Sequence, residues 1–162
     1  NQVKPPEYFP LDQRSTTRAE DPYSISKWLG ENIADAFARR NPQMALASMR
    51  FNGMWDDQYF ERLRANPISD PWTRCQGFWT YVHIRDAARA CVVALNHPDW
   101  SGHHRFFINA QDTILAIPTT EALGIVYPDV PLNIELPEFA SPISTQHAAD
   151  IIGWQPEYSW RQ

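Results

Sequence analysis

Basic residues are scarce and scattered in this sequence. Its 162 residues include 14 Lys and Arg against 19 Asp and Glu, which gives a formal net charge of −5, and Lys4 and Lys27 are the only lysines. A nucleic-acid surface requires a basic patch or stripe, and no cluster of Lys or Arg supplies one. The composition therefore excludes DNA, RNA and anionic membranes as expected partners.

Cysteine and long apolar runs are also scarce. Cys75 and Cys91 fall in neither a CxxC motif nor a metal-like spacing, so they indicate no disulfide framework. The longest strongly apolar stretch, ACVVAL at 90–95, is far shorter than the roughly 20 residues that a membrane helix needs. No charged and then apolar signal region is present either. We therefore expect a protein that resides in the reducing cytoplasm and has no membrane-spanning helix.

Tryptophan and proline are abundant instead. The chain contains 7 Trp and 14 Pro, and 43% of its residues are hydrophobic. Such a chain can bury the core of one compact domain, and its loops are rich in the aromatic side chains that line pockets. The first residues, NQVKPPEYFPLDQR, lack an initial Met and are typical of a Pro-rich loop. We therefore expect a fragment that continues from an upstream segment.

The spacing of apolar residues predicts an α/β fold. A helix is predicted at 22–40, because Asp21 can cap it, Pro22 suits its first position, and apolar residues recur at helical spacing as far as Asn41. The run QMALASMRF at 43–51 is typical of a strand buried on both faces of a parallel sheet. Further helices are predicted at 57–64, 85–97, 119–126 and 145–152, and further strands at 78–84, 104–110 and 132–136.

Tyr23 and Lys27 are four residues apart in the first predicted helix. Residues at this spacing share one helix face, with Cβ atoms about 5–6 Å apart, so both side chains can act on the same small molecule. An ammonium group beside a phenol favours the phenolate. The pair can therefore shuttle a proton for a hydroxyl group whose carbon loses hydride. The alternative is that Tyr23 packs and Lys27 is solvated.

Several segments match, in order, the motifs of one known family. PLDQRSTTRAEDPYSISKWLGE is similar to the stretch around its YxxxK motif, and ASMRFNGMW at 47–55 to the strand that leads into its substrate region. Three later segments follow in the same order: YVHIRDAARACVVAL at 81–95, HRFFINA at 104–110 and ADIIGWQPEYSW at 149–160. The chain thus resembles the extended short-chain dehydrogenases/reductases, the NAD-dependent epimerase/dehydratase family.

The resemblance implies the C-terminal part of a Rossmann-type fold. Residues 1–52 would belong to the NAD(P)-binding domain, and 53–162 would form mainly the substrate-binding region, with 78–110 returning to the sheet. The sequence has no GxxGxxG segment, so the phosphate-binding part of such a site is not in this chain. The family's catalytic Ser or Thr precedes this chain as well, and 15–17 lie in a loop that does not replace it.

The resemblance also implies roles for individual residues. With NAD or NADP as cofactor, Tyr23 is the catalytic acid/base, and Lys27 holds the nicotinamide ribose and stabilises the phenolate. Phe51 and Asn52 follow the strand where the family contacts the cofactor, so both are expected cofactor or substrate contacts; for Phe51 a structural role is equally compatible. Family members commonly pair through the helix of the motif, which implies a homodimer through the 22–40 helix.

The substrate expectation depends on a departure from the family pattern. Nucleotide-sugar members place an Arg seven residues before the Asp that corresponds to Asp86, where it binds the diphosphate, and this sequence has Trp79 there. One indole N–H cannot replace a bidentate guanidinium. Arg74 could substitute, although a surface arginine is the simpler interpretation. We expect a smaller sugar-like hydroxyl or carbonyl substrate on an aromatic wall of Trp55, Trp72 and Trp79, for each of which packing is the alternative.

Two other functions stay open: a nucleotide-sugar epimerase or dehydratase, and a binding or regulatory protein that keeps the fold without turnover.

The remaining polar residues are expected to be structural. His103 and His104 would point to opposite faces of a strand and cannot hold one ion together, so no metal site is expected. Asp86 is expected to cap a helix and His83 to pack. Glu31 is expected to face solvent, with an ion pair to Lys27 as the alternative.

Overall fold

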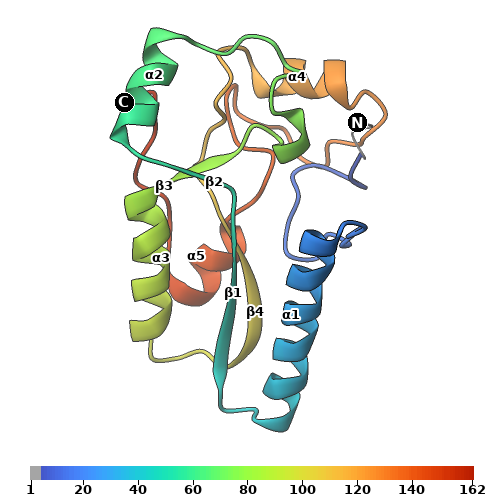
Figure 1. The fold of residues 1–162 in the computed structure, drawn as a ribbon, viewed down its shortest axis with the longest axis vertical. Coiled ribbons are helices and arrows are strands. Elements are labelled where there is room, and N and C mark those ends of the chain that lie inside the picture. The colour runs from blue at the N-terminus through green and yellow to red at the C-terminus, as the bar shows by residue number, and fades with distance from the viewer. Residues whose placement is uncertain (1–4) are drawn as a thin grey trace.

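Parallel strand pairs form the centre of the molecule, and the chain has the expected α/β architecture (Figure 1). The computed structural model describes residues 5–162. Strand β1 (Ala45–Phe51) pairs in parallel with β4 (Gly102–Ile108), and β2 (Gly53–Trp55) pairs in parallel with β3 (Tyr81–His83). In the pair of β1 and β4, residues more than fifty positions apart in sequence therefore lie side by side. A connection of this length is long enough for the crossover that parallel strands need.

The first helix, α1 (Pro22–Arg40), forms as predicted. The Asp21 carboxylate accepts a hydrogen bond from the Ser24 N–H at 3.0 Å, and Pro22 occupies the first turn, where its missing N–H costs nothing. Arg39 and Arg40 lie in the last turn, where the negative end of the helix dipole favours cations. The helix runs along one face of β1 and β4 (Figure 1).

The opposite face of this sheet carries α3 (Ile84–Asn96) and α5 (Gln146–Ile152) (Figure 1). Small residues on both helices let them approach the strands closely. The apolar cluster beneath them consists of Val82, Ala87, Ala90, Ala94, Phe106, Ile108, Ala148, Ile152 and Trp154. Gly153 ends α5 with a left-handed φ of 67°, as a helix C-terminus favours.

The other half of the molecule is rich in loops and aromatic rings. It carries α2 (Asp57–Ala65), the short 3₁₀ helix η1 (Cys75–Gly77) and α4 (Thr119–Val126). Its buried aromatic residues form edge-on and stacked pairs, which add to the stabilisation from burial. The paired rings are Phe9, Trp55, Phe60, Trp79, Tyr81 and Tyr127, and Trp160 is buried in the same cluster.

Two strand predictions differ from the structure. The strand predicted at 132–136 does not form, and Leu132 makes only an isolated bridge to Phe9. The alternating apolar residues there lie between Pro131 and Pro137, which lack the N–H that continued pairing requires. The strand predicted at 78–84 shrinks to Tyr81–His83, because Phe78 and Trp79 have φ values of 53° and 57°, outside the extended region.

Asp86 does not cap α3, contrary to expectation. The cap is His83, whose Nδ1 accepts a hydrogen bond from the Arg85 N–H at 3.3 Å. Asp86 lies in the first turn of the helix, after the cap, and is fully buried. Its carboxylate pairs with Arg89 at 2.8 Å and accepts the backbone N–H groups of 157 and 158 at 2.9 and 3.0 Å. A buried carboxylate therefore fixes the last segment of the chain to α3.

Strand β1 is also less buried than its apolar sequence suggested. Its residues are half-buried or exposed, and the exposed ones are the apolar Ala45, Ala47 and Phe51, because within residues 5–162 β1 pairs with β4 alone and has an open edge. The prediction of a strand buried on both faces was therefore wrong for the described residues. Among residues 5–162, no helix combines the length and the apolar character that crossing a membrane requires.

Candidate functional site

The first turns of α1 present Tyr23 and Lys27 on one side of the helix. The Lys27 Nζ lies 5.0 Å from the centroid of the Tyr23 ring, and Tyr23 is 70% exposed. The capping contact of Asp21 fixes where the helix begins and hence which way both side chains project. The structure thus brings the two predicted catalytic residues together, in contact and accessible.

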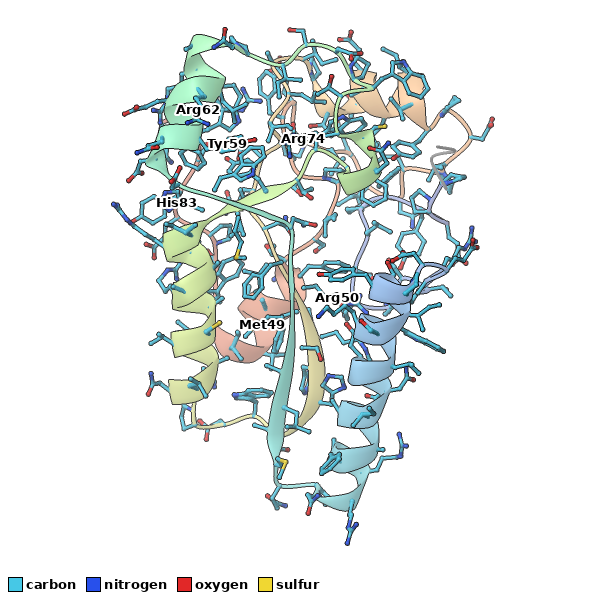
Figure 2. The ribbon with its side chains drawn as sticks, in the orientation of Figure 1. Met49, Arg50, Tyr59, Arg62, Arg74 and His83 are labelled. Atoms are coloured by element: carbon cyan, nitrogen blue, oxygen red, sulfur yellow. The ribbon has the colours of Figure 1, made fainter. Side chains whose placement is uncertain are left out.

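A cavity of about 790 Å³ lies between this part of α1 and the end of β1. Figure 2 shows Met49 and Arg50 on β1, with Arg50 toward α1. The lining includes Tyr23, Ser26, Lys27, Gly30 and Glu31 of α1, and 48–52 with Met54. Phe51 and Asn52, the expected cofactor or substrate contacts, therefore share one cavity with Tyr23 and Lys27.

Behind this cavity, α1 contacts the sheet through charged side chains. Glu31 accepts hydrogen bonds from Arg50 at 2.8 and 2.7 Å and from Arg105 at 2.9 Å, and its side chain is only 13% exposed. The expectation that Glu31 faces solvent was wrong, because two arginines on β1 and β4 draw it toward the sheet. Burial alone would raise the pKa of Glu31, but the hydrogen bonds and charges of Arg50 and Arg105 offset burial and lower it.

The seam continues one turn further along α1. Asp35 pairs with Arg105 and accepts from His103 Nδ1 at 2.7 Å, and His103 Nε2 contacts the Ser48 hydroxyl at 2.7 Å. Burial opposes ionisation of Asp35, but its bonds to His103 and Arg105 prevail and lower its pKa. We call Glu31, Asp35, Arg50, His103 and Arg105 the charged seam.

The charged seam engages Glu31, the acidic side chain one turn beyond Lys27. Because Glu31 is engaged by two arginines, no carboxylate within residues 5–162 forms an ion pair with Lys27. An unpaired ammonium beside an exposed phenol is what a proton shuttle with a bound hydroxyl substrate requires. In the described part of the chain, no group of three or more His, Cys, Asp or Glu side chains has a metal-binding arrangement, and His104 contacts His147 instead.

Asn52 lies where three cavities meet. It lines the cavity beside Tyr23, a second of about 500 Å³ toward the N-terminal loop, and a third of about 220 Å³ beneath the 74–80 loop. Its Nδ2 is buried and has no hydrogen-bond partner among residues 5–162. A buried amide donor without a partner carries a free-energy cost, which a bound acceptor would remove.

The three tryptophans of the expected aromatic wall lie in different surroundings. Trp55 and Trp79 both line the 220 Å³ cavity, whereas Trp72 is 56% exposed and is not part of that lining. The Trp79 Nε1 donates to the Pro71 carbonyl at 2.9 Å, so its only N–H is already used. Trp55 stacks between Tyr59 and Tyr81, with ring centroids 4.3 and 5.4 Å away.

Arg74, which the sequence suggested to be a surface arginine, is exposed in the structure, and it also lines the 220 Å³ cavity. Its position follows from a left-handed turn at φ 57°, which no sequence pattern of a non-glycine residue signals. Thr16 and Thr17 line the 500 Å³ cavity, so the loop before α1 also contributes to the hollow surface.

Comparisons with known proteins agree with this fold. No protein-family model matches the sequence, and no curated protein matches it. Among solved structures, UDP-glucose 4-epimerase from Bifidobacterium longum with NAD+ and UDP is 16% identical, with a TM-score of 0.59 over 96% of this chain and 56% of that chain. A short-chain dehydrogenase/reductase superfamily protein from Agrobacterium tumefaciens with bound NAD is 15% identical, with a TM-score of 0.59 over 96% and 59%.

A third structure, UDP-glucuronic acid 4-epimerase from Bacillus cereus with NAD, is 17% identical, with a TM-score of 0.57 over 93% of this chain and 50% of that chain. The chain has the Rossmann-type fold of these short-chain dehydrogenase/reductase and epimerase structures. It spans between half and three-fifths of the length of these three.

Proposed function

We propose that this chain forms the catalytic helix and the substrate-binding side of an NAD(P)-dependent enzyme that acts on a sugar-like hydroxyl or carbonyl substrate. The observation that carries this proposal is the contact of Tyr23 with Lys27 on the rim of a cavity that also reaches Phe51 and Asn52. The division at residue 52, with a cofactor side before it and a substrate side after it, belongs to the same proposal.

The residues present fit the nicotinamide and ribose end of the cofactor. The 790 Å³ cavity has the size of a small-molecule site, and the Lys27 ammonium, with three donors, can hold the ribose hydroxyls. Phe51 can cover one side of a ring, and Asn52 can donate its unpartnered Nδ2–H to an acceptor. When bound, NAD(P) supplies the carbon that accepts or returns the hydride.

Within this site, Tyr23 moves the proton. Its phenolate oxygen takes the hydroxyl proton as the substrate is oxidised and returns it when the carbonyl is reduced. Lys27 stabilises the phenolate with its charge, and the first turn of α1 adds the positive end of the helix dipole. Glu31 keeps its own charge on Arg50 and Arg105 and so does not neutralise Lys27.

The substrate is proposed to lie against the aromatic side of the hollow surface, with Trp55 and Trp79 beneath it and Trp72 nearer to solvent. A small sugar-like molecule suits this region. The alternative, a nucleotide-sugar epimerase or dehydratase, is favoured by the similarity to epimerase structures that hold UDP or NAD. A non-catalytic binding protein of this fold would keep the cavities without proton transfer.

A homodimer through the 22–40 helix is part of the proposal. Leu29, Ile33 and Phe37 on α1 are exposed on the side away from the charged seam, and two copies of this apolar side would cover each other. We expect the protein to sediment as a dimer and Ile33→Asp to yield monomers; a monomeric wild type would contradict this.

Replacement of Tyr23 by Phe in the full-length protein tests the function. Because the ring stays and only the phenolic oxygen is lost, NAD(P)-linked turnover should fall by about 10²–10⁴-fold while cofactor affinity stays nearly unchanged. Tyr158→Phe is the matched control, since Tyr158 stacks on His83 outside the three cavities that Asn52 lines. Turnover of Tyr23→Phe equal to that of the control would refute the role of Tyr23.

A further inference from the structure

Three polar side chains from three elements form a hydrogen-bonded chain where α1 covers β1 and β4 (Figure 1). The Ser48 hydroxyl of β1 lies 2.7 Å from His103 Nε2 of β4, and His103 Nδ1 lies 2.7 Å from a carboxylate oxygen of Asp35 on α1. Side chains alternate between the faces of a strand, so the next residue of β4, His104, points away from α1 and contacts His147 of α5. Hydroxyl, imidazole and carboxylate in this order form the arrangement that activates a serine.

The protons of this chain are placed by its partners. Asp35 also forms an ion pair with Arg105, so its carboxylate is ionised and only accepts hydrogen bonds. His103 Nδ1 therefore carries the proton of the bond to Asp35, and in the neutral imidazole Nε2 has the lone pair. The Ser48 hydroxyl consequently donates to Nε2, which is the atom that would take up a proton leaving the serine.

Burial differs among the three residues. The His103 side chain is only 1% exposed, which shields the imidazole from water, and Asp35 lies on the outer side of it at 31% exposure. Ser48 is half-buried, and of the three residues it alone lines the 790 Å³ cavity between α1 and β1. The hydroxyl is therefore the member of the chain that adjoins the space open to a small molecule.

The same cavity supplies the other parts of an acyl-transfer site. Tyr23, Phe51 and Met54 expose apolar surface in its lining, against which the carbon chain of an ester can pack. The lining also includes Lys27, which forms no ion pair within residues 5–162, so its charge can stabilise the oxyanion of a tetrahedral intermediate. A hydroxyl with its own base and a cation for the oxyanion thus adjoin one cavity.

We propose that Ser48 is a nucleophile toward small carboxylic esters, with His103 as its general base and Asp35 as the residue that positions His103. Ser48 Oγ attacks the carbonyl carbon while its proton passes to His103 Nε2, and the alcohol leaves with that proton as the ester C–O bond breaks. Water then attacks the acyl-serine, with His103 again as the base, which releases the acid and restores Ser48.

This activity goes beyond the proposed oxidoreductase function and does not rest on it. The net reaction converts one ester and one water into an acid and an alcohol, so it needs no cofactor, oxidant or reductant. An ester would occupy the cavity when the dinucleotide does not.

Labelling of the full-length protein with diisopropyl fluorophosphate, in the absence of NAD(P), tests the proposal. Ser48 Oγ should displace fluoride from phosphorus, and mass spectrometry of the digested protein should find the adduct on Ser48. Ser26 is the internal control, because it lines the same cavity but donates its hydroxyl to the Tyr23 carbonyl at 2.7 Å. Hydrolysis of p-nitrophenyl acetate should fall in proportion to the labelled fraction.

Variants of the chain test the roles of its other two members. His103→Gln should slow both labelling and ester hydrolysis by about 10²–10⁴-fold, because the base is lost. Asp35→Asn should slow both as well, since an amide N–H facing Nδ1 favours the tautomer whose proton is on Nε2. His104→Gln is the matched control on the opposite face and should react as the wild type does. Far-UV circular dichroism establishes that each variant is folded.

Four results would overturn the proposal: no adduct on Ser48, equal labelling of Ser26, undiminished labelling of folded His103→Gln, or labelling without ester hydrolysis. The site of the adduct is read in the wild type, so a variant that fails to fold does not leave the proposal undecided. Neither readout needs NAD(P)-linked turnover, so failure of the proposed oxidoreductase function is distinguishable from failure of this proposal.

Discussion

Two regions of the molecule are stabilised by different interactions: the contact between α1 and the sheet, and the loop-rich half. Between α1 and the sheet, charged groups of Glu31, Asp35, Arg50 and Arg105 make the contacts, and Ala38 is the buried residue of the helix. In the loop-rich half, aromatic rings such as Trp79 and Tyr81 are completely buried and form stacked or edge-on pairs. The proposed catalytic residues therefore lie on a polar contact, and the proposed substrate side lies on a tightly packed apolar cluster.

The two kinds of contact suit different tasks. An apolar aromatic cluster gives the rigid wall that a binding cavity needs, since close packing restricts side-chain movement. A charged seam depends on pH and on the integrity of each partner, because an ionised group left alone in a partly buried site is costly. The variants below affect one side at a time.

The largest effect is expected at Asp86, which lies on α3, away from the charged seam. Asp86→Ala would leave Arg89 and the backbone N–H groups of 157 and 158 without their acceptor in a fully buried position. Loss of one partner from such a buried network costs about 3–5 kcal/mol, measurable by urea unfolding. Asp129→Ala, at an exposed loop position, is the control and should be close to neutral. An equally small loss at Asp86 would show that the C-terminal segment is not held this way.

A smaller effect is expected at the charged seam. Glu31→Gln removes the charge that Arg50 and Arg105 share, at a cost of about 2 kcal/mol for charge-assisted hydrogen bonds in a partly buried site. Amide hydrogen exchange should quicken in α1 and not in α2. Glu61→Gln, on the exposed side of α2, should change neither stability nor exchange. Uniformly faster exchange would mean that α1 and the packed side unfold together.

The smallest effect is a pH dependence that distinguishes the two faces of the sheet. On the α5 face, His147 lies 3.1 Å from His104, and burial, followed by the His104 charge, lowers the pKa of His147 despite Asp150 and Asp12. The folded state then binds fewer protons than the unfolded state, so stability falls as the pH drops through 6.5 and levels off below the lowered pKa.

On the α1 face, the lowered pKa of Glu31 acts in a more acidic range. Its contribution to stability is complete above the unfolded value of 4.5 and is lost as the pH falls through the lower folded pKa. Urea unfolding of the wild type should therefore show two declines, the first absent in His147→Gln and the second reduced in Glu31→Gln. A decline near 6.5 that persists in His147→Gln would assign it to another group.

Much of the fold could be predicted from local signals. The bounds of α1 and α4 match the predicted helices at both ends, because caps, prolines and apolar spacing all act within a few residues. The strand predicted at 132–136 does not form, because among the described residues Leu132 pairs with Phe9 in an isolated bridge and the pairing does not continue.

The site was predictable only in part, for a different reason. The spacing of Tyr23 and Lys27 sets their contact within one helix, and the structure shows that contact. Glu31 and Asp86 were misplaced because their partners, Arg105 and the N–H groups of 157 and 158, are about seventy residues away in sequence. The position of Arg74 depends on a left-handed turn and on its stacking against Trp55, and neither feature leaves a pattern in the sequence.

A structure of the full-length protein with bound NAD(H) tests the central claim most directly. The account predicts the nicotinamide ring in the cavity between α1 and β1, with Lys27 Nζ in hydrogen-bond contact with the ribose and the Tyr23 oxygen facing the reacting carbon. A dinucleotide bound away from α1, or a Lys27 that makes no contact with it, would contradict the account.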